Sequence, residues 1–420
     1  MLSNRAGRLL DFASRNSLGL FVAALLLAAI FYSIYDLCFA PAYAIADWLI
    51  NYSDGFVRRG LIGEFLLLAA HAIHVPPPWV VVALQISIYT GFLAGVYRLA
   101  NPLRRDPLWY AMIFSPAALA FMIISAFNGV RKEMLAPVAL TAVIFLIRRR
   151  PHAVTLSLVI TALFAVMVLS HEAPDCCLPY FFAAVALATR NLKYAAKVMA
   201  VPLAAAVLLF GLARLYPGDQ SVAIAICHSI GGHWYGDVDF RNLCSGALVF
   251  LGWTIPMVRQ QELENLHYWP LYAVLAVLSL APYIVALIVL YRRDGLHFEV
   301  KVISAIAVLS AIASIPLFWF SIDWGRWIHM QILCLLLIIL MAAQHAPGFQ
   351  PDPNAMPFGT GRPWRMPLLI AIFVYCTCWT LPVLGMSELR FGYIPLPRYF
   401  VREFRNIYRT HGWQTIDRGW

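Results

Sequence analysis

The chain has 420 residues, of which 62% are hydrophobic and 12% charged, and its formal net charge is +10. Soluble globular domains are about half apolar and about a quarter charged, so this composition excludes an ordinary soluble fold. The long, continuous apolar runs predict an all-α polytopic integral membrane protein and disfavour a β-barrel, whose strands would alternate. The positive charge indicates no nucleic-acid partner, because basic loops set membrane topology and contact anionic membrane lipids.

Three arginines precede the first apolar run, which extends from about residue 18 to 40. This run is too long for the core of a signal peptide, so we expect a retained first span with its N-terminus in the cytoplasm. Residues 41–78 follow as a polar segment that ends in three prolines. We interpret it as the first extracytoplasmic loop, and its short apolar part, 61–73, as an interfacial or re-entrant helix.

Charge alternates along the next six apolar runs. Loops after even-numbered spans are basic with few acids, whereas loops after odd-numbered spans mix acids, bases, aromatics and glycine. Cytoplasmic loops carry an excess of Lys and Arg, so the mixed-charge exits are expected to be extracytoplasmic. The expected spans lie near 79–98, 108–126, 134–147, 153–170, 178–189 and 198–215.

The second half is less regular. We expect an extracytoplasmic loop at 216–268 with a re-entrant segment at 246–257, and a disulfide between Cys227 and Cys244 if the loop is extracytoplasmic. Further spans near 270–291, 302–320, 328–344 and 366–385 bring the count to about eleven in one transmembrane domain, 1–420. Counting 246–257 as a full span gives twelve and moves everything after it to the other face. A basic C-terminal tail occupies 386–420.

The sharpest polar pattern lies in residues 51–64. Asp54 and Arg58 are four residues apart and would meet on a helix. Arg58 and Arg59 suit bidentate binding of phosphate or pyrophosphate oxygens, and Asp54 can serve as a general base. The alternative is a local ion pair at a helix start, with the arginines at lipid headgroups. Three glycines allow close backbone approach to a ligand, namely Gly55, Gly60 and Gly63.

Two more clusters end spans on the same predicted face. Arg131 and Lys132 follow the third span, where basic residues oppose the usual distribution and indicate phosphate binding. The alternative is snorkelling to the interface. His171 and Glu172 end the fifth span, and such a pair can perform acid–base catalysis or bind a divalent cation such as Mg²⁺ or Mn²⁺. The alternative is ordinary solvation of a helix end.

The remaining clusters are weaker. Asp237 and Asp239 form an Asp-x-Asp pair that can coordinate a metal ion and, through it, a diphosphate, although the alternative is a solvated loop. Asp323, Trp324 and Arg326 stand at a span boundary, where aromatic rings and charges can form a sugar-binding surface. Interfacial tryptophans are also ordinary belt residues.

These features resemble the polytopic, polyprenyl-phosphate-dependent glycosyltransferases of the GT-C fold and the related lipid-linked polysaccharide polymerases. In that group an acidic catalytic residue lies in the first extracytoplasmic loop beside interfacial helices. The resemblance implies that Asp54, with Asp47 as second choice, takes that role, and that Arg58, Arg59, Arg131 and Arg326 hold the lipid phosphate. It covers the arrangement of the chain and short strings of residues. The large soluble C-terminal domain of many GT-C enzymes has no counterpart.

The resemblance implies a polyprenyl-linked sugar donor, a glycan or lipid acceptor and a bacterial cytoplasmic membrane, in cell-envelope glycan assembly. A transporter or flippase for a lipid-linked saccharide is the main alternative. Such proteins usually carry ionisable residues near the bilayer midplane and often show internal repeats, whereas the charges here gather at span ends. A non-enzymatic assembly protein is a further alternative.

Overall fold

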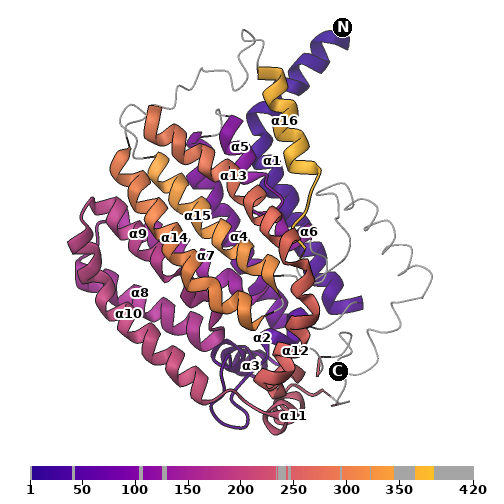
Figure 1. The fold of residues 1–420 in the computed structure, drawn as a ribbon. Helices are drawn as coiled ribbons and strands as arrows, with labels where there is room; N and C mark the ends of the chain where they lie inside the picture. Colours follow the sequence, from indigo (N-terminus) through magenta and orange to yellow (C-terminus); the bar gives the residue numbers. More distant parts are fainter. Residues whose placement is uncertain are drawn as a thin grey trace.

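Apolar helices dominate the computed structural model of the chain (Figure 1). It describes residues 2–39, 43–103, 107–124, 130–232, 234, 243–244, 247–293, 296–321, 323–344 and 365–382. Within these ranges every regular element is helical, which confirms the all-α polytopic class. The α-helices are α1 (Leu2–Phe39), α2 (Tyr43–Trp48), α3 (Leu61–Ile73), α4 (Pro77–Ala100), α5 (Pro107–Ile113), α6 (Phe121–Ile124), α7 (Leu135–Ile147), α8 (Ala153–Ser170), α9 (Leu178–Thr189), α10 (Leu192–Leu215), α11 (Gln220–Ser229), α12 (Ile255–Asn265), α13 (Trp269–Arg293), α14 (His297–Phe320), α15 (Trp324–Ala343) and α16 (Arg365–Thr377). The 3₁₀ turns are η1 (Asn101–Leu103), η2 (Lys132–Met134), η3 (Ala173–Cys177), η4 (Val249–Gly252) and η5 (Leu266–Tyr268).

Within the described ranges, seven helices are long and apolar enough to cross a membrane: α1, α4, α8, α10, α13, α14 and α15. The sequence predicts about eleven spans, and the difference lies in short or broken helices. The run expected at 108–126 is interrupted by turns between α5 and α6, and α7, α9 and α16 have only 13, 12 and 13 residues. The expected short helix 61–73 forms as α3. Residues 249–265 form η4 and α12.

The central helix is α15, which has 94% of its span buried inside the protein, against 44% or less for the other six long helices. It packs against α7, α13 and α14, so its side chains form the middle of the main hydrophobic core. Because lipid cannot reach it, polar groups on α15 must be satisfied by other protein groups. A helix in this position can carry functional side chains into the protein interior.

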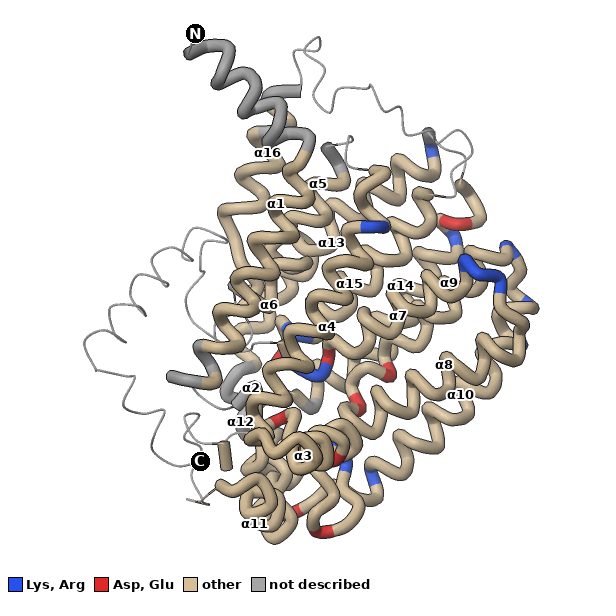
Figure 2. The backbone as a smooth tube through the Cα atoms, turned by 180° about the vertical axis from the view of Figure 1, so that it is seen from behind, with Lys and Arg blue, Asp and Glu red and all other residues tan. Residues whose placement is uncertain are grey.

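The bundle has two ends of different character. At the basic end, α7 finishes next to Arg148–Arg150 and α9 next to Arg190, and the side chains of Arg148 and Gln344 join this end to the end of α15. At the opposite, mixed-charge end, α8 ends at Ser170 and α15 begins at Trp324. Figure 2 shows acidic and basic positions side by side in the interior near α2 and α4, and other basic positions close to the turn after α9.

A second, smaller hydrophobic core lies at the mixed-charge end. It joins apolar side chains of α2, the 49–60 loop, α3, α11 and η4, including Trp48, Val57 and Leu251. The start of α11 is fixed by Asp219, whose side chain accepts hydrogen bonds from Ser221 N and Val222 N. This small core supports the loop that carries Arg58 and Arg59.

Candidate functional site: a charge cluster at one end of the bundle

Charged side chains from four separate segments converge at the mixed-charge end. They come from α2 and the loop after it, from η2, from the turn after α8, and from the start of α15. The members are Asp47, Arg58, Arg59, Arg131, Lys132, Glu133, His171, Glu172, Asp323 and Arg326. With His171 neutral, the five cations exceed the four carboxylates by one charge.

Arg58, Arg59 and Glu172 form the outer cluster, which is partly exposed. Arg59 donates from Nε and Nη2 to the two carboxylate oxygens of Glu172, at 2.8 and 2.7 Å. Arg58 Nη1 lies 3.4 Å from Oε1 of the same residue. The side chains of Arg58, Arg59 and Glu172 are 18, 26 and 13% exposed. Burial raises the pKa of Glu172, but the charge and hydrogen bonds of Arg59 outweigh it and hold that pKa well below its usual range.

The backbone at Arg59 is strained. Its φ of 69° lies in the left-handed region, which costs a residue with a side chain about 1–2 kcal/mol. Lys132 Nζ donates to the Arg59 carbonyl at 2.9 Å and holds this conformation. The strained turn directs both Arg58 and Arg59 toward Glu172, which is a geometry that a regular helix through this segment would not give.

Arg131, Glu133, His171, Asp323 and Arg326 form the inner cluster, which is more deeply buried. Arg326 makes ion pairs with Glu133 and Asp323, and Arg131 Nε lies 4.0 Å from Glu133. The side chains of Arg131, Glu133 and Arg326 are at most 8% exposed. The preceding residue is anchored as well, because Trp48 Nε1 and Gln85 Nε2 both donate to the Val130 carbonyl. A pairing of this kind joins η2 to α15 across the bundle.

His171 is neutral by its hydrogen bonds. Its Nδ1 accepts from Ala173 N at 3.2 Å, so the ring proton sits on Nε2, which lies 3.2 Å from Glu133 Oε1. Burial and the charge of Arg59 lower the pKa of His171 to about 3, in agreement with this tautomer. The Nε2 proton therefore serves to hold the Glu133 carboxylate, and the contact is a hydrogen bond of a neutral imidazole.

Lys132 and Asp47 lie between the two clusters and are fully buried, at 0 and 1% exposure. Burial lowers the pKa of Lys132 to about 8, although the charge of Asp47 opposes the shift. Burial raises the pKa of Asp47, but Lys132, Arg131, His171 and Arg59 outweigh it and bring that pKa to about 2. Oδ2 of Asp47 has no hydrogen-bond partner among the described residues. A buried carboxylate with an open oxygen beside several cations can accept a proton from an incoming group.

A small cavity of about 10 Å³ adjoins the inner cluster. This is room for about one water molecule. Arg131, Glu133, Arg326 and His329 supply its polar wall, and Met122, Met134, Pro137, Met330 and Leu333 the apolar remainder. His329 Nδ1 bonds to the Ala117 carbonyl at 2.8 Å, and its ring stacks on Phe121. The cavity ends in apolar side chains, so no polar passage leads from it along α15.

The sequence predictions compare with this arrangement in several ways. Arg58, Arg59, Arg131, Lys132, His171, Glu172, Asp323 and Arg326 gather at one end, as expected, and Trp324 is buried in contact with Tyr272 at the start of α15. This placement of Asp323 with Glu133 agrees with the eleven-span arrangement, in which 246–257 does not cross. Asp237 and Asp239 lie outside the described residues, and within those residues no group of three metal-ligating side chains occurs.

Asp54 is placed differently from the expectation. The helix that would bring it to Arg58 does not form, because residues 53–59 make a bridge and a turn. Asp54 is exposed, whereas Arg58 reaches Glu172, 114 residues away. Asp47 occupies the cluster instead. The signal for it was a carboxylate inside an apolar segment, Tyr-Ala-Ile-Ala-Asp-Trp, which was given second place. Glu133 and His329 were not selected, although both stand within the quoted motifs.

The glycines of this loop also have a different role. A Cβ at Gly60 would overlap the Tyr52 ring, and one at Gly63 would overlap the Ile50 carbonyl. These two glycines let the 49–52 segment lie directly against α3, so they serve packing and not ligand approach. Gly55 has φ +93° with open space around its Cβ position, which fits an exposed turn.

A family model described as "Uncharacterised membrane protein Rv1490" matches residues 18–238, more than half of the chain. The chain belongs to this family. The matched segment contains Asp47, the outer cluster and η2, but not α15, which supplies Asp323 and Arg326. No curated protein and no solved structure matches the chain. The family identifies a membrane protein and carries no activity with it.

Proposed function

We propose that this protein is a membrane glycosyltransferase that uses a polyprenyl-phosphate- or pyrophosphate-linked sugar donor for cell-envelope glycan or polysaccharide assembly. The observation that carries the proposal is the charge cluster, which has an excess of positive charge and lies at the end of a membrane bundle. Burying unpaired cations costs several kcal/mol each, so an anion that completes their pairing would be stabilised there. A lipid-borne phosphate would approach such a site from the membrane surface.

The outer cluster would bind the phosphate. Arg58 and Arg59 already hold the two oxygens of Glu172, a planar anion with the spacing that guanidinium forks recognise. A phosphate can replace this carboxylate on the same donors. The exchange is feasible because all three side chains are partly exposed, unlike those of Arg131, Glu133 and Arg326.

Asp47 would be the general base, in place of Asp54. In the reaction, the acceptor hydroxyl gives its proton to Asp47 and attacks the anomeric carbon, whose bond to the phosphate oxygen breaks. Cations lower the pKa of Asp47 to about 2, which makes it a weak base in the free protein. A bound phosphate neutralises part of that positive charge and would raise this pKa, so donor binding would activate the base. Asp47 is buried, so the outer cluster must open when the donor binds.

The arrangement of charge favours this function over a transporter or flippase. Transport sites usually place ionisable groups near the bilayer midplane. Here the central helix α15 carries its charged residues at its first turn, and from Met330 to Met341 its only polar side chain is Gln331, paired with Ser310 and Ser314. The charged groups therefore serve one end of the bundle.

Membrane orientation follows the same argument. The arginines at the basic end favour the cytoplasm. The Cys227–Cys244 disulfide belongs to the small core at the mixed-charge end, and disulfides persist in oxidising compartments. We therefore place the site on the extracytoplasmic face of a bacterial cytoplasmic membrane. Asp54→Cys should react with an impermeant maleimide in intact cells, and Lys193→Cys only after permeabilisation. The reverse pattern would place the site in the cytoplasm.

The function is tested by mass spectrometry of lipid-linked saccharides in cells with the protein, without it, and with single variants. Asp47→Asn keeps the shape and removes the basicity, so turnover should fall about 10²–10⁴-fold. Asp54→Asn is the matched control and should keep full turnover. Loss in Asp54→Asn with activity in Asp47→Asn would reverse their roles. An unchanged saccharide profile in cells lacking the protein would reject the glycosyltransferase proposal.

A further inference from the structure

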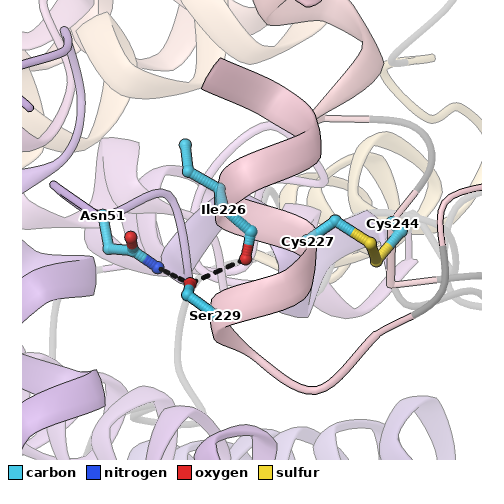
Figure 3. The surroundings of a disulfide bond; sticks show 5 residues. All are labelled: Asn51, Ile226, Cys227, Ser229 and Cys244. Atoms are coloured by element: carbon cyan, nitrogen blue, oxygen red, sulfur yellow. Dashed lines mark hydrogen bonds between the residues drawn. A yellow bond between two sulfur atoms is a disulfide. The ribbon is translucent and has the colours of Figure 1, made fainter. Parts of the chain in front are cut away.

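The disulfide-closed segment after α10 lies directly against the loop that carries Arg58 and Arg59. Cys227 ends the buried face of α11 and bonds to Cys244, 17 residues later (Figure 3). Both cysteines are fully buried in the small hydrophobic core. The covalent bond therefore fixes α11 to the segment before η4 at a position inside the core, where neither partner contacts solvent.

Two contacts join α11 and its preceding turn to the loop backbone. Asn51 Nδ2 donates to Ser229 Oγ at 2.9 Å, and Ser229 in turn donates to the Ile226 carbonyl, one residue before Cys227 (Figure 3). At the other end of the loop, Arg58 N donates to the Tyr216 carbonyl at 2.9 Å. The loop is thus held at its first residue and at the arginine itself.

The turn before α11 also holds the Arg58 side chain. Arg58 Nε donates to the Pro217 carbonyl at 2.9 Å, while Nη1 points to Glu172. Phe56 packs edge-on against Tyr216, with ring centroids 5.3 Å apart. Gly218, at φ +80°, brings the turn against Val57, whose methyl group would lie 2.9 Å from a Cβ at this position. Its lack of a side chain thus permits the close approach.

From these contacts we propose that residues 216–232, closed by the Cys227–Cys244 disulfide, are a clamp that positions Arg58 for anion binding. The clamp holds one guanidinium edge on Pro217 and leaves the other edge for the anion. Cys227, Ser229 and Tyr216 are positioning residues in this view, because they act through Arg58 and touch no ligand. That the anion is a lipid phosphate rests on the proposed function; the positioning itself does not.

The test measures two quantities on the full-length protein in detergent. Amide hydrogen exchange follows residues 51–60, and equilibrium binding uses farnesyl phosphate as probe with farnesol as the uncharged control. The samples are the oxidised protein, the protein after reduction by a phosphine, the reduced protein reoxidised with diamide, and the variant Cys227→Ser/Cys244→Ser. Cys378→Ser, which removes an exposed free thiol, is the matched control.

Opening the disulfide should speed exchange of the Arg58 amide at least tenfold, leave α15 protected and weaken farnesyl phosphate binding about tenfold. Reoxidation should restore both, which separates positioning from misfolding. Unchanged exchange at residues 51–60 after reduction would overturn the clamp. Faster exchange with unchanged phosphate affinity would also overturn it, because Arg58 would then bind without positioning. Equal binding of farnesyl phosphate and farnesol to the oxidised protein would reject the lipid phosphate, and the exchange result would still decide the clamp.

Discussion

The outer and inner clusters contain the same chemical groups in different surroundings. In the outer cluster Glu172 holds Arg58 and Arg59 close to the surface, whereas in the inner cluster Glu133 is shared by Arg326, Arg131 and His171 in the interior. Exposed ion pairs contribute little to stability, and a buried pair becomes costly when one partner is removed. The outer cluster can therefore exchange partners with a ligand, while the inner cluster joins η2, the turn after α8 and α15 into one unit.

The largest difference is expected from removing the two glutamates. Glu133→Ala should lower the free energy of unfolding by about 3–5 kcal/mol, because Arg326 and His171 stay buried without their shared carboxylate. Glu172→Ala should lower it by no more than about 1 kcal/mol, because Arg58 and Arg59 can turn to water. Denaturant unfolding in detergent measures both. Equal losses would show that the clusters do not differ in this way.

The arginines of the outer cluster should show the opposite division. Arg58→Ala/Arg59→Ala should weaken farnesyl phosphate binding roughly ten- to a hundredfold, since a charge-assisted hydrogen bond contributes about 1.5–3 kcal/mol. Its free energy of unfolding should stay within about 1 kcal/mol of the parent value. Arg59→Lys keeps the charge but loses the fork, so it should weaken binding less. Undiminished binding by the double variant would remove the outer cluster from the site.

The smallest effect concerns acid stability. The folded-state pKa of His171 is lowered to about 3, so between about pH 6 and 3 the unfolded chain binds a proton that the folded protein does not. The stability from this group is present above that window and falls with pH inside it, by at most about 1.4 kcal/mol per pH unit. His171→Gln can keep both hydrogen bonds without titrating.

Comparing the unfolding free energy of the parent and His171→Gln from pH 7 to pH 4 tests this. The difference between them should change with pH in the direction given, with the parent losing more stability in acid. Parallel curves would mean that His171 does not stay neutral in the folded protein.

The sequence was sufficient for the elements and for the grouping of charge. Apolar runs gave the helices, and the mixed-charge exits correctly predicted that Arg58, Arg131, Glu172 and Asp323 share one end. Span number was overestimated because a short apolar run such as 135–147 has the composition of a span without its length, and sequence alone does not distinguish a short buried helix from a full crossing.

The sequence determined which residues lie at the mixed-charge end of the bundle, because hydrophobic length and loop charge are local properties that each segment carries by itself. Only the tertiary structure decided how those residues pair. Arg59 finds its partner 113 residues away, and Asp47 enters the cluster while Asp54, seven residues later, stays at the surface. The physical reason is that packing of the small core turns Trp48 and Val57 inward, and this orients the charged residues beside them.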